Sequence, residues 1–244
     1  MFFVSGLTGK VGGAAARRLL EKGCKVRTLA RDPAKAAGWA DRGVDVRQGD
    51  FDDAASVAAA LEGVDGAFVM LPPVLAPSKD YAEARTTIAS LVTALRQAAP
   101  PKIVALSSIG SEQASGLGLI TGTHLLEEAL AGLSMPKAIV RAGSFIDNAL
   151  HGLPRAIETG VFDSFQAPVD RPVPMVGTAD IGTEVAPWLM HDWTGTKIVD
   201  LGSPATPVAP ALPLAPATRT PLPAPPHPRA PSPTALPSIP TAPP

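Results

Sequence analysis

A glycine-rich turn lies between a short apolar stretch and a helical segment at the start of the chain. The stretch is Phe2-Phe3-Val4, and Gly6, Gly9 and Gly12 follow it at intervals of three residues. In a strand-to-helix turn of this kind, the first glycine permits the tight turn, the second lets the backbone approach a pyrophosphate, and the third lets helix and strand pack closely. The N–H groups at the start of the helix would then face an anionic ligand. The turn therefore predicts a dinucleotide site; the alternative is that these are ordinary turn glycines.

The following residues alternate short apolar strands with helices, which predicts a parallel sheet covered on both faces. We expect strands over 2–4, 25–30, 44–47, 66–71, 102–106, 137–140 and 197–201. We expect helices over 11–22, from Pro33, from Asp52 or Asp53 to Leu61, and over 81–98, 123–131 and 180–190. With the glycine-rich first turn, this order predicts an α/β protein with a Rossmann-type doubly wound parallel sheet. The rival is a (β/α)8 barrel, which needs about 250 residues and eight units.

The residue at the end of the second expected strand indicates which dinucleotide binds. An acid near this position bonds the ribose 2′-hydroxyl of NAD, whereas an arginine accommodates the 2′-phosphate of NADP. Arg31 stands there, and its planar guanidinium suits a phosphate. We therefore expect NADP(H) to be favoured over NAD(H). The adjacent Asp32 argues the other way, and the alternative is a solvated pair at a strand end.

Composition excludes several other functions. The net charge of −1 argues against nucleic-acid binding and against a polybasic membrane patch. The single cysteine, Cys24, excludes an intrachain disulfide and a multi-cysteine zinc site, and the histidines have no metal-ligand spacing. No apolar run approaches the ~20 residues of a membrane helix. We expect a cytoplasmic protein without metal, nucleic-acid or membrane partners.

The chain changes composition abruptly near its end. Residues 203–244 hold 16 of the 28 prolines and lack glycine, lysine, acidic and aromatic residues. Such a segment cannot bury enough apolar surface to offset its ordering entropy. We therefore predict one NAD(P)-binding domain over residues 1–203, followed by a disordered, Pro/Ala-rich tail over residues 204–244.

In several motifs the first 204 residues resemble the NmrA-like, NAD(P)H-binding atypical short-chain dehydrogenases. The motifs, in chain order, are VSGLTGKVGGAAARRLL, Arg31-Asp32-Pro33, Gly49-Asp50-Phe51, Leu71-Pro72-Pro73, Ser107-Ser108, RAGSFIDN at 141–148, VGTADI at 176–181 and IVDLGSP at 198–204. Such an ordered series is more specific than a glycine triplet alone.

The resemblance implies a role for each matching position. The cofactor-binding set becomes Gly6, Thr8, Gly9, Lys10, Val11, Gly12, Arg31, Asp50, Phe51, Leu71, Pro72 and Ser107. Within it, residues 8–11 would wrap the pyrophosphate, Asp50 and Phe51 would flank the adenine, and Leu71 and Pro72 would border the nicotinamide ribose. Phe145 and Asn148 would approach the substrate. The alternatives are a strand end at Leu71-Pro72-Pro73, a turn cap at Ser107, a core position for Phe145 and a helix cap for Asn148.

The chain lacks the Tyr-x-x-x-Lys pair with which many short-chain dehydrogenases move protons. Its one tyrosine, Tyr81, precedes Arg85 rather than a lysine and lies before the Ser107 strand. Members of the NmrA-like family also lack the pair; they include quinone, azo-dye and triphenylmethane-dye reductases and non-catalytic redox sensors. His124 could donate a proton, or it could be a solvated helix histidine.

Two functions follow from the resemblance. The first is an NADPH-dependent reductase of a small quinone-like or dye-like acceptor, and the second is a non-catalytic NADP-sensing regulator with a protein partner. A third reading is a damaged gene product that binds the cofactor poorly or not at all. We hypothesise that the Pro-rich tail results from a frameshift, because the motif matches end where the composition changes. The substrate side would then lie open to water and turnover would be feeble; the alternative is a genuine Pro-rich spacer or ligand.

Overall fold

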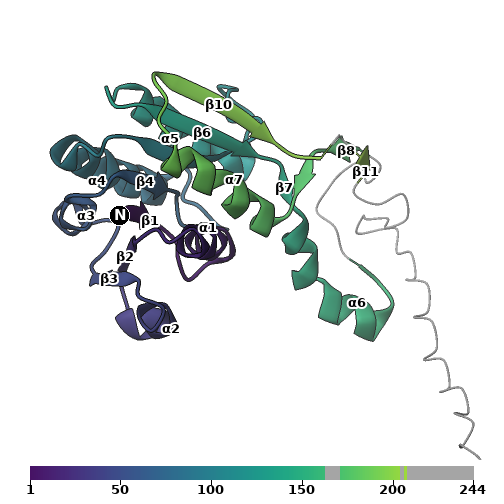
Figure 1. The fold of residues 1–244 in the computed structure, drawn as a ribbon. Helices are drawn as coiled ribbons and strands as arrows, with labels where there is room; N and C mark the ends of the chain where they lie inside the picture. The colour runs from purple at the N-terminus through teal and green to yellow at the C-terminus, as the bar shows by residue number, and fades with distance from the viewer. Residues whose placement is uncertain (163–170, 204–205, 208–244) are drawn as a thin grey trace, which may run out of the picture.

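The computed structural model of the protein describes residues 1–162, 171–203 and 206–207. Seven parallel strands form its central sheet in the order β10-β6-β5-β4-β1-β2-β3 (Figure 1). Their bounds are β1 Phe2–Val4, β2 Val26–Ala30, β3 Asp45–Gln48, β4 Gly66–Val69, β5 Ile103–Ser108, β6 Lys137–Ala142 and β10 Thr196–Leu201. The strand order reverses beside β1, so this is the predicted Rossmann-like α/β fold and not a closed barrel.

Helices cover both faces of the sheet (Figure 1). The longer ones are α1 Lys10–Glu21, α3 Ala54–Leu61, α4 Ala82–Ala98, α5 Thr121–Ala131 and α7 Thr178–Met190; α2, Ala37–Ala40, follows a 3-10 turn over Pro33–Ala36. Residues of α3, α4 and α5 contribute to one apolar core, and residues of α1 and α7 contribute to the other. Adjacent residues of β1 show the division, because Phe3 belongs to the first core and Val4 to the second.

Local chemistry explains where the elements begin and end. Asp53 caps α3 by accepting hydrogen bonds from the backbone N–H groups of Ala55 and Ser56. Gly23, with φ of +75°, follows the C-terminus of α1. The expected strand over 66–71 ends earlier, at Val69, because the chain leaves the ladder at Met70, whose N–H bonds the Ser5 hydroxyl.

The first and last long helices pack directly on each other through a small residue. A Cβ on Gly182 of α7 would overlap Ala14 of α1 and would lie 2.5 Å from the backbone nitrogen of Ala15. Glycine at this position therefore permits an approach of the two helices that no larger residue fits. This contact holds α1 and α7 side by side against one face of the sheet.

Several short elements were not predicted. They are the 3-10 turns Gly118–Ile120 (η2) and Ile146–His151 (η3), α6 Leu153–Thr159, and the two-residue strands β7 Ser144–Phe145, β8 Pro172–Val173, β9 Met175–Val176 and β11 Thr206–Pro207. β7 pairs with β9 in parallel, and β8 pairs with β11 in antiparallel fashion. Two to seven residues are too few to establish a period of 2 or 3.6, so a sequence pattern cannot indicate them.

The predicted Pro-rich tail lies outside the described residues except for Thr206–Pro207. The boundary between residues 203 and 204 and the frameshift therefore stay predictions. Within the described ranges, no helix is both long and apolar enough to cross a membrane.

Candidate functional site

A cleft of about 390 Å³ opens where β1, β2 and β4 end. This is the edge at which open α/β sheets bind ligands, beside the point where the strand order reverses. Seven residues from the predicted cofactor set line the cleft: Gly6, Thr8, Gly9, Arg31, Phe51, Leu71 and Pro72. Residues far apart in the sequence are thus brought into one concave surface.

The glycine turn forms one wall of the cleft. Gly6 adopts a φ of +63°, which L side chains rarely adopt, and the Gly9 N–H donates to the Gly6 carbonyl at 2.8 Å. A Cβ on Gly12 would lie 2.5 Å from the Ser5 carbonyl oxygen, so this glycine gives the close packing of helix and turn that its spacing predicts. α1 begins with no side-chain cap and no acidic residue in its first turn. Its first N–H groups therefore suit an anionic group such as a pyrophosphate.

Two cationic side chains lie at one end of the cleft, just after β2. Arg31 follows the last residue of β2, and Lys35 lies in the next turn; both are exposed and both line the cleft. Asp32 also lines the cleft, and one oxygen of its carboxylate accepts the Ala34 N–H at 3.0 Å and caps the 3-10 turn. Among the described residues, neither the Arg31 side chain nor the Lys35 side chain has a hydrogen-bond or ion-pair partner. The sequence reading missed Lys35, although its four-residue spacing from Arg31 was available as a signal.

Apolar side chains complete the cleft on either side of the cations. Phe51 is half-buried, with its ring 6.4 Å from that of Phe3. Asp50 does not line the cleft, because its carboxylate accepts the Asp52 N–H at 3.1 Å within the turn that presents Phe51. Leu71 and Pro72 form the opposite wall after β4.

The remaining residues of the predicted turn lie beneath or beside the cleft. Val11 is buried in the core, and Gly12 is buried against the turn, so only their backbone N–H groups are available to a ligand. The Lys10 ammonium lies 3.9 Å from an Asp147 carboxylate oxygen. Asp147 also accepts the Thr178 N–H at 2.8 Å, and this bond is the main cause of its lowered pKa. Asp147 thereby joins the starts of α1 and α7.

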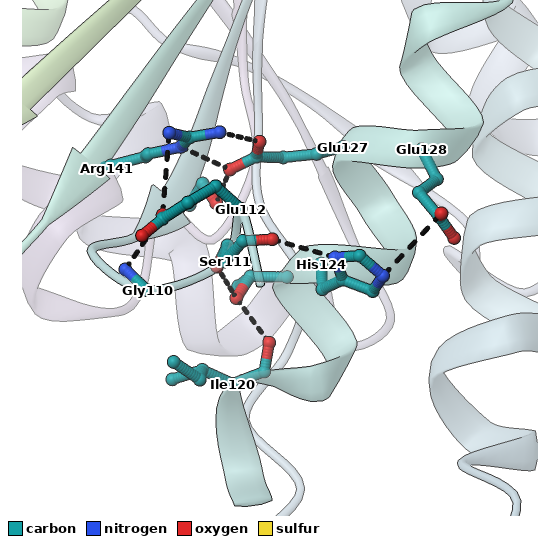
Figure 2. A network of polar contacts seen from close by, with 10 residues as sticks. Gly110, Ser111, Glu112, Ile120, His124, Glu127, Glu128 and Arg141 are labelled. Carbon is teal, nitrogen blue, oxygen red and sulfur yellow. Dashed lines mark hydrogen bonds and ion pairs between the residues drawn. The ribbon is translucent and has the colours of Figure 1, made fainter. Parts of the chain in front are cut away.

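Ser107 does not line the cleft and belongs instead to a polar network with Glu127 and Arg141, two residues that Figure 2 shows together with Glu112. Its hydroxyl donates to the Glu127 carboxylate, which also binds the Arg141 guanidinium through Nε at 3.0 Å and an Nη at 2.7 Å. Arg141 lies 3.5 Å from Glu112 as well. Hydrogen bonding to Glu127 raises the pKa of Arg141, which keeps the arginine charged. The sequence gives no sign of this network, since no spacing links Glu127 on a helix to Arg141 on a strand.

The His124 ring lies between Ser111 and Glu128, away from Glu112 and Glu127 (Figure 2). Its Nδ1 lies 2.8 Å from the Ser111 carbonyl oxygen, so Nδ1 carries the hydrogen, and its Nε2 lies 3.6 Å from Glu128. The structure does not bring His124 into the cleft. A structural role for the ring agrees with these contacts.

The two residues expected on the substrate side also lie outside the cleft. Phe145 is half-buried in β7 and packs against the core of α1 and α7. Asn148 is exposed in the turn that precedes α6. Within the described ranges, no three His, Cys, Asp or Glu side chains gather in a way that could hold a metal ion.

A family model for NAD(P)H-binding proteins matches residues 6–145, which include the glycine turn, Arg31 and the Leu71-Pro72 wall. The chain belongs to this NAD(P)H-binding family. The resemblance drawn from the sequence motifs is thereby confirmed, and the fold, the turn and the family agree.

Two curated proteins are similar in sequence to this chain. One is quinone oxidoreductase 2 of Escherichia coli, 29% identical over 164 residues, which are 66% of this chain and 55% of the relative. The other is the NAD(P)H azoreductase of Xenophilus azovorans, 32% identical over 162 residues, which are 66% of this chain and 54% of the relative. The chain thus spans little more than half the length of these relatives.

A solved structure supports the likeness in three dimensions. The NADPH-dependent quinone oxidoreductase of Escherichia coli, determined in complex with NADPH, superimposes with a TM-score of 0.72 at 25% identity. The superposition covers 84% of this chain and 70% of the other.

Proposed function

We propose that the protein is an NADPH-dependent reductase of small quinone-like or dye-like acceptors. The observation that carries the proposal is the end of the cleft, where two cations, Arg31 and Lys35, stand beside one carboxylate, Asp32, that also caps the 3-10 turn. A 2′-phosphate would meet two cations there, against the single carboxylate of Asp32 that could bond the 2′-hydroxyl of NAD. Similarity to a quinone reductase and an azoreductase supports the choice of acceptor.

The chain's own residues would bind and orient the cofactor. The α1 N-terminus and Gly9 would hold the pyrophosphate, Arg31 and Lys35 the 2′-phosphate, and Phe51 the adenine. Leu71 and Pro72 would limit the nicotinamide end and exclude water there. When bound, NADPH supplies a hydride to the quinone, which takes a proton from solvent and leaves as the hydroquinone while NADP⁺ remains.

Among the described residues, the polar groups near the cleft do not form the tyrosine–lysine relay that moves protons in alcohol oxidation. The Ser107 hydroxyl donates to Glu127, whose carboxyl group also binds Arg141. The network around Ser107 thus contains an acid–arginine pair. Acceptors whose reduced oxygens can be protonated by solvent suit such a site.

Measuring the preference for NADPH over NADH tests whether Arg31 and Lys35 bind a 2′-phosphate. Calorimetric titration should show tighter binding of NADPH than of NADH, and Arg31→Ala should weaken NADPH binding by roughly 10- to 100-fold, because charge-assisted hydrogen bonds contribute about 1.5–3 kcal/mol. NADH affinity should change little. Arg18→Ala is the matched control, because Arg18 lies on α1 and pairs with Glu21 away from the cleft. Equal affinities of the parent protein for both cofactors would contradict the assignment.

Steady oxidation of NADPH on adding a quinone would support the reductase function. Binding of NADPH without its oxidation by quinone or azo acceptors would instead favour the non-catalytic, NADP-sensing alternative.

We propose that residues 1–203 form the cofactor-binding domain.

A further inference from the structure

A second, smaller cavity adjoins the cleft. This apolar slot, of about 190 Å³, lies between the loop after β4 and the start of α5. Leu71, Pro72 and Pro73 line both cavities, so the cleft and the slot meet at these residues. A ligand in the slot would therefore be a neighbour of whatever occupies the end of the cleft at Leu71.

The mouth of the slot holds unusually exposed apolar side chains. Leu75 is 84% exposed and Leu119 is 60% exposed, although the two come from different loops and line one cavity. Val74 beside them is also exposed. Large apolar side chains that gather around a cavity are a typical sign of a binding site, because a ligand would remove them from water.

One tyrosine braces the slot. Tyr81 adopts a φ of +58°, which is uncommon for a residue other than glycine, and its hydroxyl donates to the Gly118 carbonyl at 2.9 Å. This bond ties the start of α4 to the turn that carries Leu119, so two segments that line the slot are joined.

One carboxylate gives the slot its electrostatic character. Glu83 lines the cavity and is bound by the Ser78 N–H and hydroxyl, the hydroxyl at 2.8 Å. Hydrogen bonds to its own backbone amide and to Ser78 lower its pKa, so Glu83 is negatively charged at neutral pH. A negative charge at an apolar cavity disfavours an anionic ligand.

We propose that the apolar slot is the acceptor site, and that it binds a single uncharged quinone ring in preference to a sulfonated or otherwise anionic one. This inference rests on the proposed reductase function for its choice of ligand. It places the acceptor against Leu75 and Leu119 rather than against Phe145 and Asn148, the positions that the family resemblance implies. Leu75 and Leu119 are then specificity-determining residues.

The test uses the full chain and tetramethyl-1,4-benzoquinone, whose fully substituted ring cannot alkylate Cys24. Binding is measured by saturation-transfer NMR without cofactor, and turnover by NADPH oxidation. Leu75→Asp and Leu119→Asp should each raise the Kd and the KM for this quinone about tenfold while leaving NADPH affinity unchanged. Ile157→Asp is the matched control, since Ile157 is 75% exposed and lies outside the slot. All three side chains are at the surface, so the variants should remain folded.

The outcomes separate the slot from the reductase. If the quinone binds with this dependence on Leu75 and Leu119 but NADPH is not oxidised, the slot stands and the reductase function fails. If the quinone does not bind, or if the slot variants behave like Ile157→Asp, the slot is wrong. Loss of quinone binding in Phe145→Ala or Asn148→Ala, with Leu75→Asp unaffected, would place the acceptor at the position that the resemblance implies. A sulfonated benzoquinone that binds as tightly as the neutral ring would overturn the charge preference.

Discussion

The contact between α1 and α7 predicts how one substitution, Gly182→Ala, changes the stability of the protein. Replacing glycine by alanine in a helix ordinarily stabilises it by about 0.5–1 kcal/mol. Here the new Cβ would overlap Ala14 and lie 2.5 Å from the Ala15 nitrogen. These are fixed atoms of a packed helix and not the flexible end of a side chain, so the helices must separate. Overpacking of this kind costs about 1–3 kcal/mol.

The steric effect should therefore exceed the gain in helix propensity. We expect Gly182→Ala to lower the free energy of unfolding by about 1–2 kcal/mol, or the Tm by roughly 2–8 °C for a domain of this size. Gly122→Ala in α5 is the matched substitution. Its Cβ would be at ordinary contact distance, 3.7 Å from its nearest neighbours, so this variant should be as stable as the parent or more stable by about 0.5 kcal/mol.

Urea denaturation followed by circular dichroism measures both variants under the same conditions. NADPH titration adds a functional readout, because movement of α1 would shift the N–H groups at its start. If Gly182→Ala proved as stable as Gly122→Ala, the close approach of α1 and α7 would not be a determinant of stability, and the packing argument would be refuted.

Two further predictions concern charged groups. Arg141→Met should lower the free energy of unfolding by about 2–4 kcal/mol in urea denaturation, because it leaves the Glu127 carboxylate, only 14% exposed, without its cation; the double variant Arg141→Met/Glu127→Met should recover at least half of that loss. The pKa of Asp147 is lowered from 3.8 by its bond to Thr178, so its contribution to stability is present above pH 3.8 and is lost as the pH falls through the lowered value. Asp147→Asn should thus be less stable than the parent at neutral pH and converge with it in acid, and a stability difference that persisted unchanged at the lowest pH would contradict this.

The sequence was informative wherever a pattern repeats or a local motif has one geometric solution. The parallel sheet followed from alternating apolar strands and helices, and the Asp53 cap and the turn at Gly23 were predictable from local chemistry. Gly6, Arg31, Phe51 and Leu71 were predicted as site residues and indeed line one cleft. Their roles toward a cofactor stay predictions.

What the sequence could not indicate depends on contacts between distant segments. Gly182 has no local signal, because its requirement comes from Ala14 on another helix. The bond from the Ala34 N–H to the Asp32 carboxylate and the place of Lys35 beside Arg31 in the cleft became apparent only from the structure. The slot likewise joins Leu75 and Leu119 from separate loops, and His124 could be set aside only after its ring was seen against Ser111.

The packing of α7 on α1 also bears on the order in which the chain can mature. The glycine turn and α1 are synthesised well before α7, which packs on α1 and is among the last segments of the described fold to be made. Contacts between such distant segments slow folding, because loop-closure entropy is lost before the contact forms. A nascent chain interrupted before α7 would expose the apolar face of α1 and would be prone to aggregation. The N-terminal dinucleotide motif therefore becomes a rigid site only after nearly the whole folded part has been synthesised.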